Sequence, residues 1–336
     1  MTRIYSSMFK GQKAVTLEND LLRVVVLPKL GGKVSSFFHK EKGFELAAQR
    51  NAVGCDETTP RDCLPGVDSY DLPLFGASFG QFDASGIDDA FPNVIPSEEV
   101  VGAEPRSYPD HGEIWSAQFA SEILGDQLRL FYESKYFSYR YVKRITLSDS
   151  RLLFRYEIEN FGAGVFPCLW TFHGLMRYEE DMRVLLPKWD GVESSGRREI
   201  LNVFDSKTLG EDGRIYDYEG EEYDFRGVPP ASSNDAIKFF LNGSVQEGSC
   251  GLEYPSVGLR CKLDYDKSDL PYLGFWLTAG RYRGDYNCAL EPASGFYDSL
   301  PMAEASGTLW HMKPDEVRRF YLGISLEGMG CNSQKC

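Results

Sequence analysis

The chain consists of short runs in which apolar and polar residues alternate, separated by polar turns. Residues 140–147 and 152–159 alternate with a period of two around the turn Asp149-Ser150, which is typical of a half-buried β-hairpin. We expect no amphipathic helix longer than about 12 residues. The pattern predicts an all-β fold of mostly antiparallel strands, a sandwich or a barrel. Strands are predicted at 15–17, 22–28, 31–38, 117–124, 128–134, 139–147, 152–160, 237–241, 258–263, 272–278, 287–291 and 317–325.

Two segments interrupt this pattern. Residues 50–100 are dense in Gly and Pro yet keep aromatic residues, so we expect a long, ordered and functional loop with apolar anchors. Residues 186–235 are polar and Gly-rich, with acidic runs, and are predicted to form an excursion that holds a few short strands.

The length and the charge limit the class of protein. With 336 residues, 42% of them apolar, the chain can bury a large core, and we expect one domain over residues 1–336 with a polar tail at about 328–336. The net charge of −14 disfavours nucleic acids and anionic membranes, which carry negative charge themselves. A small molecule is therefore the expected partner, and the chain is expected to be a monomer or a homodimer.

The cysteines and the N-terminus indicate a cytoplasmic protein. None of the eight cysteines forms a C-x-x-C pair of the kind found in zinc and redox sites. The first residues lack the apolar core of a signal peptide, and no stretch of about 18 apolar residues occurs. Free thiols in a reducing compartment are the simplest interpretation.

The candidate chemistry lies in a few histidines and one carboxylate. Of the four histidines, His39 in a charged turn is expected to be a surface residue, and His311 near the last strands is expected to be structural or solvated. His111 follows a Pro-Asp pair and precedes a glycine, and His173 closes an aromatic run, so each is either structural or part of a site. Glu291 ends an apolar strand just before a proline, which ends strand pairing and points the acid toward an edge or a cleft.

Several segments resemble, in order, those of the aldose 1-epimerase (galactose mutarotase-like) family. Residues 17–24 and Gly31-Gly32-Lys33-Val34 resemble the N-terminal segment of the family. Residues 109–115 resemble the region that carries the family's first active-site histidine. Residues 170–173 resemble the strand that carries the second. Leu290-Glu291-Pro292 resembles the motif with the catalytic glutamate, and 307–325 the last strands. The resemblance spans nearly the whole chain and implies a galactose mutarotase-like β-supersandwich with a sugar cleft across one sheet.

The resemblance also implies a chemistry without metal or cofactor. Interconverting sugar anomers needs a base for the C1 hydroxyl and an acid for the ring oxygen. Glu291 is expected to be the base and His173 the acid, kept charged by a nearby carboxylate. His111, Asp89 and Trp276 are expected to bind the substrate; for Asp89 a solvated loop acid is as good an interpretation, and for Trp276, as for Trp115, core packing is a strong one.

The sequence leaves the substrate and three other functions open. No arginine can be placed as the family's substrate ligand, so galactose is not implied, and a free or a phosphorylated sugar remains possible. A non-catalytic carbohydrate-binding protein would need no acid and base together. A glycoside hydrolase or lyase would need a second carboxylate, Glu113 or Asp89, opposite Glu291. A metal-dependent isomerase could use His111 and Glu113, although no third ligand is apparent.

Overall fold

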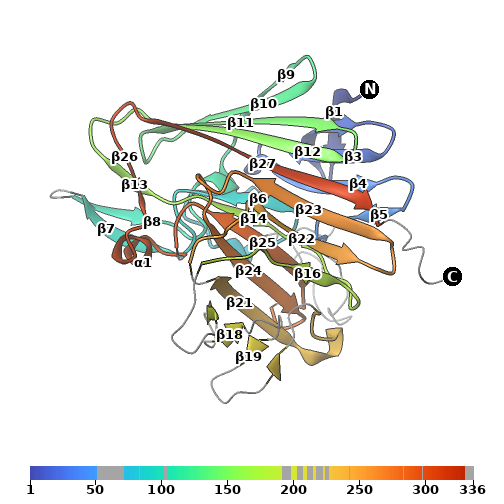
Figure 1. The fold of residues 1–336 in the computed structure, drawn as a ribbon. Coiled ribbons are helices and arrows are strands. Elements are labelled where there is room, and N and C mark those ends of the chain that lie inside the picture. Colours follow the sequence, from blue (N-terminus) through green and yellow to red (C-terminus); the bar gives the residue numbers. More distant parts are fainter. Residues whose placement is uncertain are drawn as a thin grey trace, which may run out of the picture.

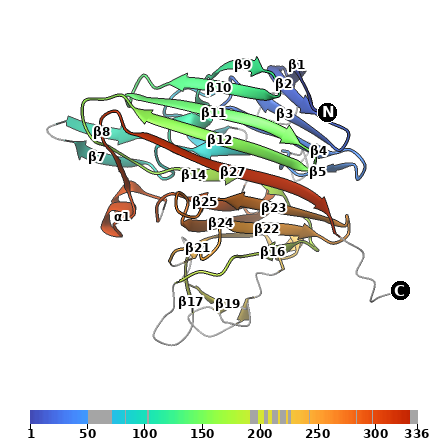
Figure 2. The ribbon, with the colours of Figure 1, turned by 45° about the horizontal axis from the view of Figure 1, so that its top comes forward.

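Two large antiparallel sheets make up most of the described chain. The computed structural model describes residues 1–50, 72–82, 84–101, 104–190, 198–202, 207–209, 215–216, 222–223, 227–241, 243–282, 284–296 and 298–329. Within these residues, the longer sheet has fifteen strands and the shorter one has eight. Figures 1 and 2 show the eight-stranded sheet laid over part of the larger one.

The larger sheet begins with the N-terminal strands and continues through strands that are far apart in sequence. Its order is β1 (Arg3–Phe9), β2 (Gln12–Glu18), β3 (Leu22–Leu27), β4 (Lys33–His39), β6 (Ile87–Ala90), β14 (Thr171–Gly174), β25 (Tyr286–Ala293), β24 (Tyr272–Ala279), β21 (Asp235–Leu241), β17 (Arg198–Asn202), β18 (Lys207–Leu209), β19 (Ile215–Tyr216) and β20 (Glu222–Tyr223). The short strands β5 (Phe44–Glu45) and β15 (Met176–Arg177) pair with β4 and β25.

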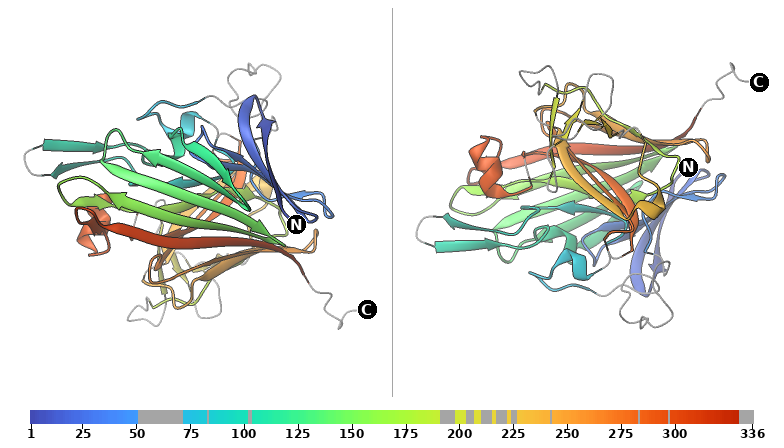
Figure 3. Two further views of the ribbon diagram at one scale, coloured as in Figure 1. Left: turned by 90° about the horizontal axis from the view of Figure 1, so that it is seen from above. Right: turned by 90° about the horizontal axis from the view of Figure 1, so that it is seen from below.

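The eight-stranded sheet contains the longest strands. Its order is β16 (Arg183–Leu185), β22 (Ser249–Tyr254), β23 (Leu259–Tyr265), β27 (Val317–Gly328), β12 (Arg151–Asn160), β11 (Tyr139–Ser148), β10 (Gln127–Glu133) and β9 (Ala120–Leu124). Seen from above in Figure 3, β27 in red runs beside the green strand β12. Smaller elements are the pairs β13 (Phe166–Cys168) with β26 (Trp310–Met312) and β7 (Ser97–Val101) with β8 (Glu104–Tyr108), the helix α1 (Leu300–Ala305), and 3₁₀ turns at Phe79–Gln81, Ile114–Ser116 and Ala231–Ser233.

The main core lies between the two sheets. Val24 and Phe37 of the larger sheet and Phe154 and Leu322 of the eight-stranded sheet belong to one apolar cluster, and all four are fully buried. The alternation in the sequence explains this arrangement, because side chains on a strand point in turn to opposite faces. None of the helices in the described part of the chain is long and apolar enough to cross a membrane.

The sequence predicts most of these strands. The hairpin of β11 and β12 has the predicted turn, and the predicted strands at 15–17 and 22–28 pair as β2 and β3, with Leu17 opposite Val24. The strands β1, β6, β7, β8, β22 and β26 are among those missed, and β6 is missed because it lies within the Gly- and Pro-rich segment that predicts a loop. The part of that segment from 51 to 71 lies outside the described residues, as does the tail from 330.

Two local predictions are wrong. Pro292 does not end the strand: β25 continues to Ala293, and Pro292 pairs with Leu273 of β24. On the other side of β25, the only residue paired with β14 is Ala293. Pro292 has no N–H to donate, and it is tolerated in the strand because the hydrogen-bonding pattern is already interrupted there. His39 is not a surface residue, because it is the last residue of β4 and only 6% exposed.

Candidate functional site

A pocket of about 370 Å³ lies where four strands of the larger sheet meet several connecting segments. The strands β14, β25, β24 and β21 are consecutive in that sheet, and Figure 1 shows them side by side. The polar and aromatic residues that line the pocket are Ser78, Phe79, Asp110, His111, His173, Lys238, Trp276, Thr278, Tyr282, Asp285, Asn287, Glu291 and Asp298.

Strand register brings the side chains on the sheet together. Asn287 and Glu291 are four residues apart on β25, so both side chains point to the same face. Trp276 on β24 pairs with Ala289 of β25, and Lys238 on β21 pairs with Trp276. The row from β21 to β25 therefore places a cation, an aromatic ring and a carboxylate on one surface.

A lysine and two carboxylates form the polar centre of the pocket. The Lys238 ammonium donates a hydrogen bond to Glu291 Oε2 and lies 3.4 Å from Asp298 Oδ2. All three side chains are at most 9% exposed. Gly274 lies opposite Glu291, and a Cβ at this glycine would approach Glu291 Oε2 to 3.1 Å, so the glycine leaves room for the carboxylate.

Burial and charge act against each other in this cluster. Burial raises the pKa of Glu291 above its usual range, while the Lys238 charge opposes the rise. For Lys238, burial disfavours the charge, but Asp298 and Glu291 outweigh it and raise the pKa. Glu291 Oε1 and Asp298 Oδ1 are buried and have no hydrogen-bond partner within the described residues. Because buried polar atoms are normally hydrogen-bonded, these two oxygens are available to a ligand.

His111 is fixed at the pocket wall by a tight turn and by Asp110. Its ring Nδ1 lies 2.7 Å from Asp110 Oδ1, and its ring stacks on Phe79 with centroids 4.4 Å apart. The next residue, Gly112, has a positive φ, and a Cβ there would come within 2.3 Å of Phe91 O. Burial opposes the ionisation of Asp110, but hydrogen bonds and the charge of His111 lower its pKa on balance.

His173 lies deeper, on β14. Its ring meets those of Phe79 and His111 edge to face, with centroids 4.9 Å and 4.8 Å away. Burial lowers its pKa well below the usual value, and the charges of His111, Lys238 and Lys33 lower it further. The expectation that a carboxylate keeps His173 charged is therefore wrong, because the charges that act on it are cations. Its Nδ1 is buried without a partner within the described residues.

The structure brings together most, but not all, of the residues singled out from the sequence. His111, His173, Trp276 and Glu291 all line the pocket, although they come from distant parts of the chain. Asp89 does not line it. Its neighbour Asp88 pairs with His173 across β6 and β14, and Asp89 itself is fully buried.

Asp89 instead holds the polar part of the core between the sheets. It accepts hydrogen bonds from Tyr141 Oη at 3.1 Å, Lys143 Nζ at 2.9 Å and Tyr156 Oη at 3.0 Å. A carboxylate with three buried partners is satisfied by the protein itself. The expectation that Asp89 binds sugar hydroxyls is not supported, and its role is to pair with the buried Lys143.

Glu113 is likewise a structural residue. Its carboxylate accepts hydrogen bonds from the hydroxyls of Tyr132, Ser134 and Tyr139 at 2.6 to 2.7 Å. Neither Glu113 nor Asp89 faces Glu291 across the pocket, so the second carboxylate that a hydrolase needs is not one of these two. Within the described residues, no group of three or more His, Cys, Asp or Glu side chains could hold a metal ion.

The two tryptophans differ in their surroundings. The Trp276 indole N–H donates to Asn287 Oδ1 at 3.0 Å, and Tyr282 meets its ring edge to face, so the ring is fixed at the pocket wall. Trp115 is 3% exposed and packs against Phe79, so it supports the wall from behind.

Among the pocket residues that sequence reasoning does not assign, Lys238, Asp298 and Asp110 carry the charges closest to Glu291 and His111. A signal for Lys238 exists, because it is a single cation inside the apolar run 235–241. His311 is exposed and forms an ion pair with Glu304, as expected for a surface residue. The four cysteines in the described residues, Cys168, Cys250, Cys261 and Cys288, are buried free thiols.

Many solved structures share this fold, whereas sequence comparisons find no matching family model and no matching curated protein. A galactose mutarotase-like protein from Clostridium acetobutylicum has a TM-score of 0.63 and 17% identity, and covers 98% of this chain and 99% of its own. A galactose mutarotase-like protein from Lactobacillus casei has a TM-score of 0.64 and 14% identity, and the match covers 94% of this chain and 100% of that protein. A candidate aldose 1-epimerase from Escherichia coli has a TM-score of 0.64 and 16% identity, and the match covers 98% of this chain and 100% of that protein.

These similarities cover almost the full length of each protein at identities that establish the fold alone. The fold expected from the sequence is confirmed: the chain is all-β, its sheets are antiparallel, and it has the galactose mutarotase-like fold.

Proposed function

We propose that the protein is a mutarotase that interconverts the α and β anomers of an aldose. The observation that carries the proposal is the pocket itself, in which a buried carboxylate with an unpartnered oxygen shares a wall with two histidines and a tryptophan. Ring opening needs a base near the C1 hydroxyl and a proton donor near the ring oxygen, and this pocket offers both.

Glu291 is the base in this proposal. The ion pair with Lys238 favours the ionised carboxylate even though the site is buried. Its Oε1 accepts the proton of the C1 hydroxyl as the bond between C1 and the ring oxygen breaks. The open-chain aldehyde then rotates about C1–C2, and Glu291 returns the proton when the ring closes on the other face.

His173 is the proton donor to the ring oxygen, and it acts from its neutral form. Because Nδ1 has no acceptor within the described residues, the ring proton is best placed on Nε2. The same cations that lower the pKa of His173 stabilise the negative charge that develops on its ring as it donates. A neutral imidazole is an established electrophile in enzymes.

His111 and Trp276 position the sugar. Asp110 holds His111 through Nδ1, which leaves Nε2 to bind the ring oxygen or a neighbouring hydroxyl. The face of Trp276 offers an apolar surface for the C–H groups of the sugar ring. No step of this reaction requires a metal or a cofactor. A location in the cytoplasm is part of the same proposal and is supported by the buried free thiols.

Polarimetry of freshly dissolved α-anomers, with and without the protein, tests the proposal. Faster approach to anomeric equilibrium for at least one aldose is the expected result. If no aldose is accelerated while sugars still bind, the protein is a carbohydrate-binding module on this fold. Inhibition by EDTA would favour a metal-dependent isomerase instead.

A further inference from the structure

A buried carboxylate that the ring-opening chemistry does not use lies beside His173. Asp88 on β6 is the cross-strand partner of His173 on β14, and directly opposed side chains point to the same face of a sheet. Their Cβ atoms are therefore about 4.5–5.5 Å apart, close enough for a hydrogen bond between the side chains, direct or through one water. The next residue, Asp89, points to the opposite face and pairs with Lys143 of the second sheet.

Lys33 on β4 adds a cation to this row. Val34 of β4 pairs with Ile87 of β6, which brings Lys33 next to Asp88 in the antiparallel register. The Lys33 ammonium lies 2.9 Å from Asp88 Oδ2, and both side chains are only 1% exposed. The same ammonium donates to the carbonyl of Ser85, so its position is fixed. Asp88 Oδ2 thus faces the cation, and Oδ1 is left for another partner.

Two buried polar atoms of this row have no hydrogen-bond partner within the described residues, Asp88 Oδ1 and His173 Nδ1. Because buried polar atoms are normally hydrogen-bonded, two such atoms on paired neighbours indicate a contact between them, made by a small side-chain rotation or by one bridging water. A single proton satisfies both atoms, with the Asp88 carboxyl as the donor and Nδ1 as the acceptor. The other ring proton then stays on Nε2, where the proposed ring opening requires it.

The surroundings of Asp88 allow its carboxyl to carry that proton. Burial raises the pKa of Asp88 to about 6, against the charges of Lys33 and Lys143, and the charge of Asp89 contributes to the rise. The protonated carboxyl therefore predominates below about pH 6 and is still populated near neutral pH. His173 stays neutral over the same range, because burial and nearby cations lower its pKa.

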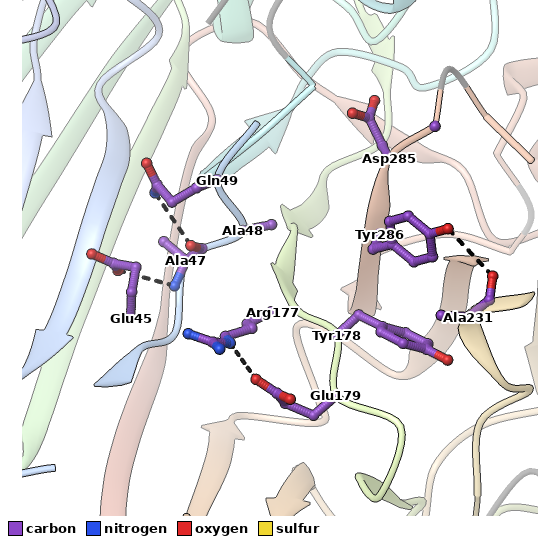
Figure 4. Close-up of a pocket in the computed structure, with 11 residues that line it drawn as sticks. Glu45, Ala47, Ala48, Gln49, Arg177, Tyr178, Glu179, Ala231, Asp285 and Tyr286 are labelled. Carbon is purple, nitrogen blue, oxygen red and sulfur yellow. Dashed lines mark hydrogen bonds and ion pairs between the residues drawn. The ribbon is translucent and has the colours of Figure 1, made fainter. Parts of the chain in front are cut away.

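Other carboxylates on the same sheet are already bound by the protein. A second cavity, of about 540 Å³, is lined by residues of β5, β15 and β25, and it contains Glu45 and Glu179. Figure 4 shows Glu45 accepting from the backbone N–H of Ala47, and Glu179 paired with Arg177. In the described part of the chain, neither carboxylate has a buried oxygen without a partner, which is the feature that marks Asp88.

We propose that Asp88 is a positioning residue for the proton donor and passes its own proton to His173 Nδ1 while Nε2 protonates the ring oxygen. This inference rests on the proposed function. As the bond between C1 and the ring oxygen breaks, its electron pair takes the proton of Nε2. The proton of Asp88 Oδ1 moves to Nδ1, so the imidazole stays neutral and only its tautomer changes. The carboxylate left on Asp88 is stabilised by Lys33, and ring closure reverses both transfers.

The pH profile of kcat, measured by polarimetry on an accelerated aldose, tests this relay. Because the relay needs protonated Asp88, kcat should fall as pH rises through about 6. Asp88→Asn keeps the shape and a hydrogen-bond donor but cannot transfer a proton. This basic limb should therefore disappear in Asp88→Asn, and kcat should drop by about 10²-fold, the lower end of what one proton transfer contributes.

A second variant moves the limb instead of removing it. The charge of Lys33 lowers the pKa of Asp88, so Lys33→Gln should shift the basic limb upward by about 1–3 pH units. This variant leaves no buried charge unpaired, because Asp88 can take up a proton, so it decides the matter should Asp88→Asn fail to fold. The matched control is Asp89→Asn, since Asp89 is the next residue of β6 and is also paired with a buried lysine, but on the opposite face. Asp89→Asn should keep the basic limb.

Three outcomes are distinguishable. A basic limb that is lost in Asp88→Asn, moved upward in Lys33→Gln and kept in Asp89→Asn supports the relay. Mutarotation without a basic limb, or with a limb that persists in Asp88→Asn or stays in place in Lys33→Gln, overturns the relay but leaves the proposed function intact. No acceleration of any aldose by the unchanged protein overturns the proposed function and the relay with it.

Discussion

The pH dependence of a Lys238 variant tests how the buried base is kept ionised. Lys238 donates to Glu291 and also contacts Asp298, so it is the cation that balances both carboxylates. Lys238→Gln removes the charge but keeps a side chain that can donate hydrogen bonds. If Glu291 is the base, activity requires its ionised form.

The size of the effect follows from the two opposing causes. Burial raises the pKa of Glu291, and the charge of Lys238 is the largest cause that lowers it. An opposite charge at contact distance is worth about 1–3 pKa units, so its loss should raise the apparent pKa of the carboxylate cluster by that amount. Activity of the unchanged protein should fall as pH drops through a value above the ordinary 4.5. In the variant this fall should begin about 1–3 units higher.

Polarimetric measurement of kcat/KM from pH 4 to pH 9 measures this shift. Lys262→Gln is the matched control, because Lys262 is an exposed lysine on β23 of the other sheet. An acid limb that stays in place in Lys238→Gln, or moves to lower pH, would refute the assignment of Glu291 as a base balanced by Lys238.

Three further substitutions distinguish residues that contact the substrate or the base from residues that stabilise the fold. Gly274→Ala places a Cβ 2.9 Å from Phe240 Cζ and 3.1 Å from Glu291 Oε2, so both side chains must shift. A displaced base should lower kcat by about 10- to 100-fold, and unchanged kcat would argue against this geometry. Asp89→Asn should lower the free energy of unfolding by about 3–5 kcal/mol in urea titrations, because Lys143 loses its buried partner; a raised KM at unchanged stability would restore Asp89 as a sugar ligand. Trp276→Ala should raise KM about twofold to tenfold at similar kcat, and an unchanged KM would place the ring outside the substrate contacts.

The sequence predicts the fold well because alternation encodes the faces of a sheet. The strands β11 and β12 are clear from a period of two, since one of their faces is buried and the other is solvated. The strand β6 lacks this signal: its four residues Ile87–Ala90 are all buried, and Asp88 and Asp89 give it the appearance of a loop. Its pairing with β14 is a long-range contact that local pattern cannot reveal. That residues 1–336 form one domain stays a prediction.

The candidate site is predicted in part. Glu291, His173 and His111 stand out because each interrupts an apolar or turn motif, and the structure places all three at one pocket. The environment of these residues could not be predicted. The lowered pKa of His173 depends on its burial and on cations from other segments, and the position of Asp89 depends on Lys143 of the second sheet. Such contacts are properties of the packing and leave no local mark in the sequence.

The most direct measurement of the central claim is mutarotation by Glu291→Gln, compared with the unchanged protein on the same sugar. Gln is nearly isosteric, so the fold and sugar binding, measured by calorimetry, should persist. The proposed mechanism predicts that acceleration falls by about 10²- to 10⁴-fold, the usual contribution of one general base. Full acceleration by Glu291→Gln would contradict the mechanism and show that another group removes the proton.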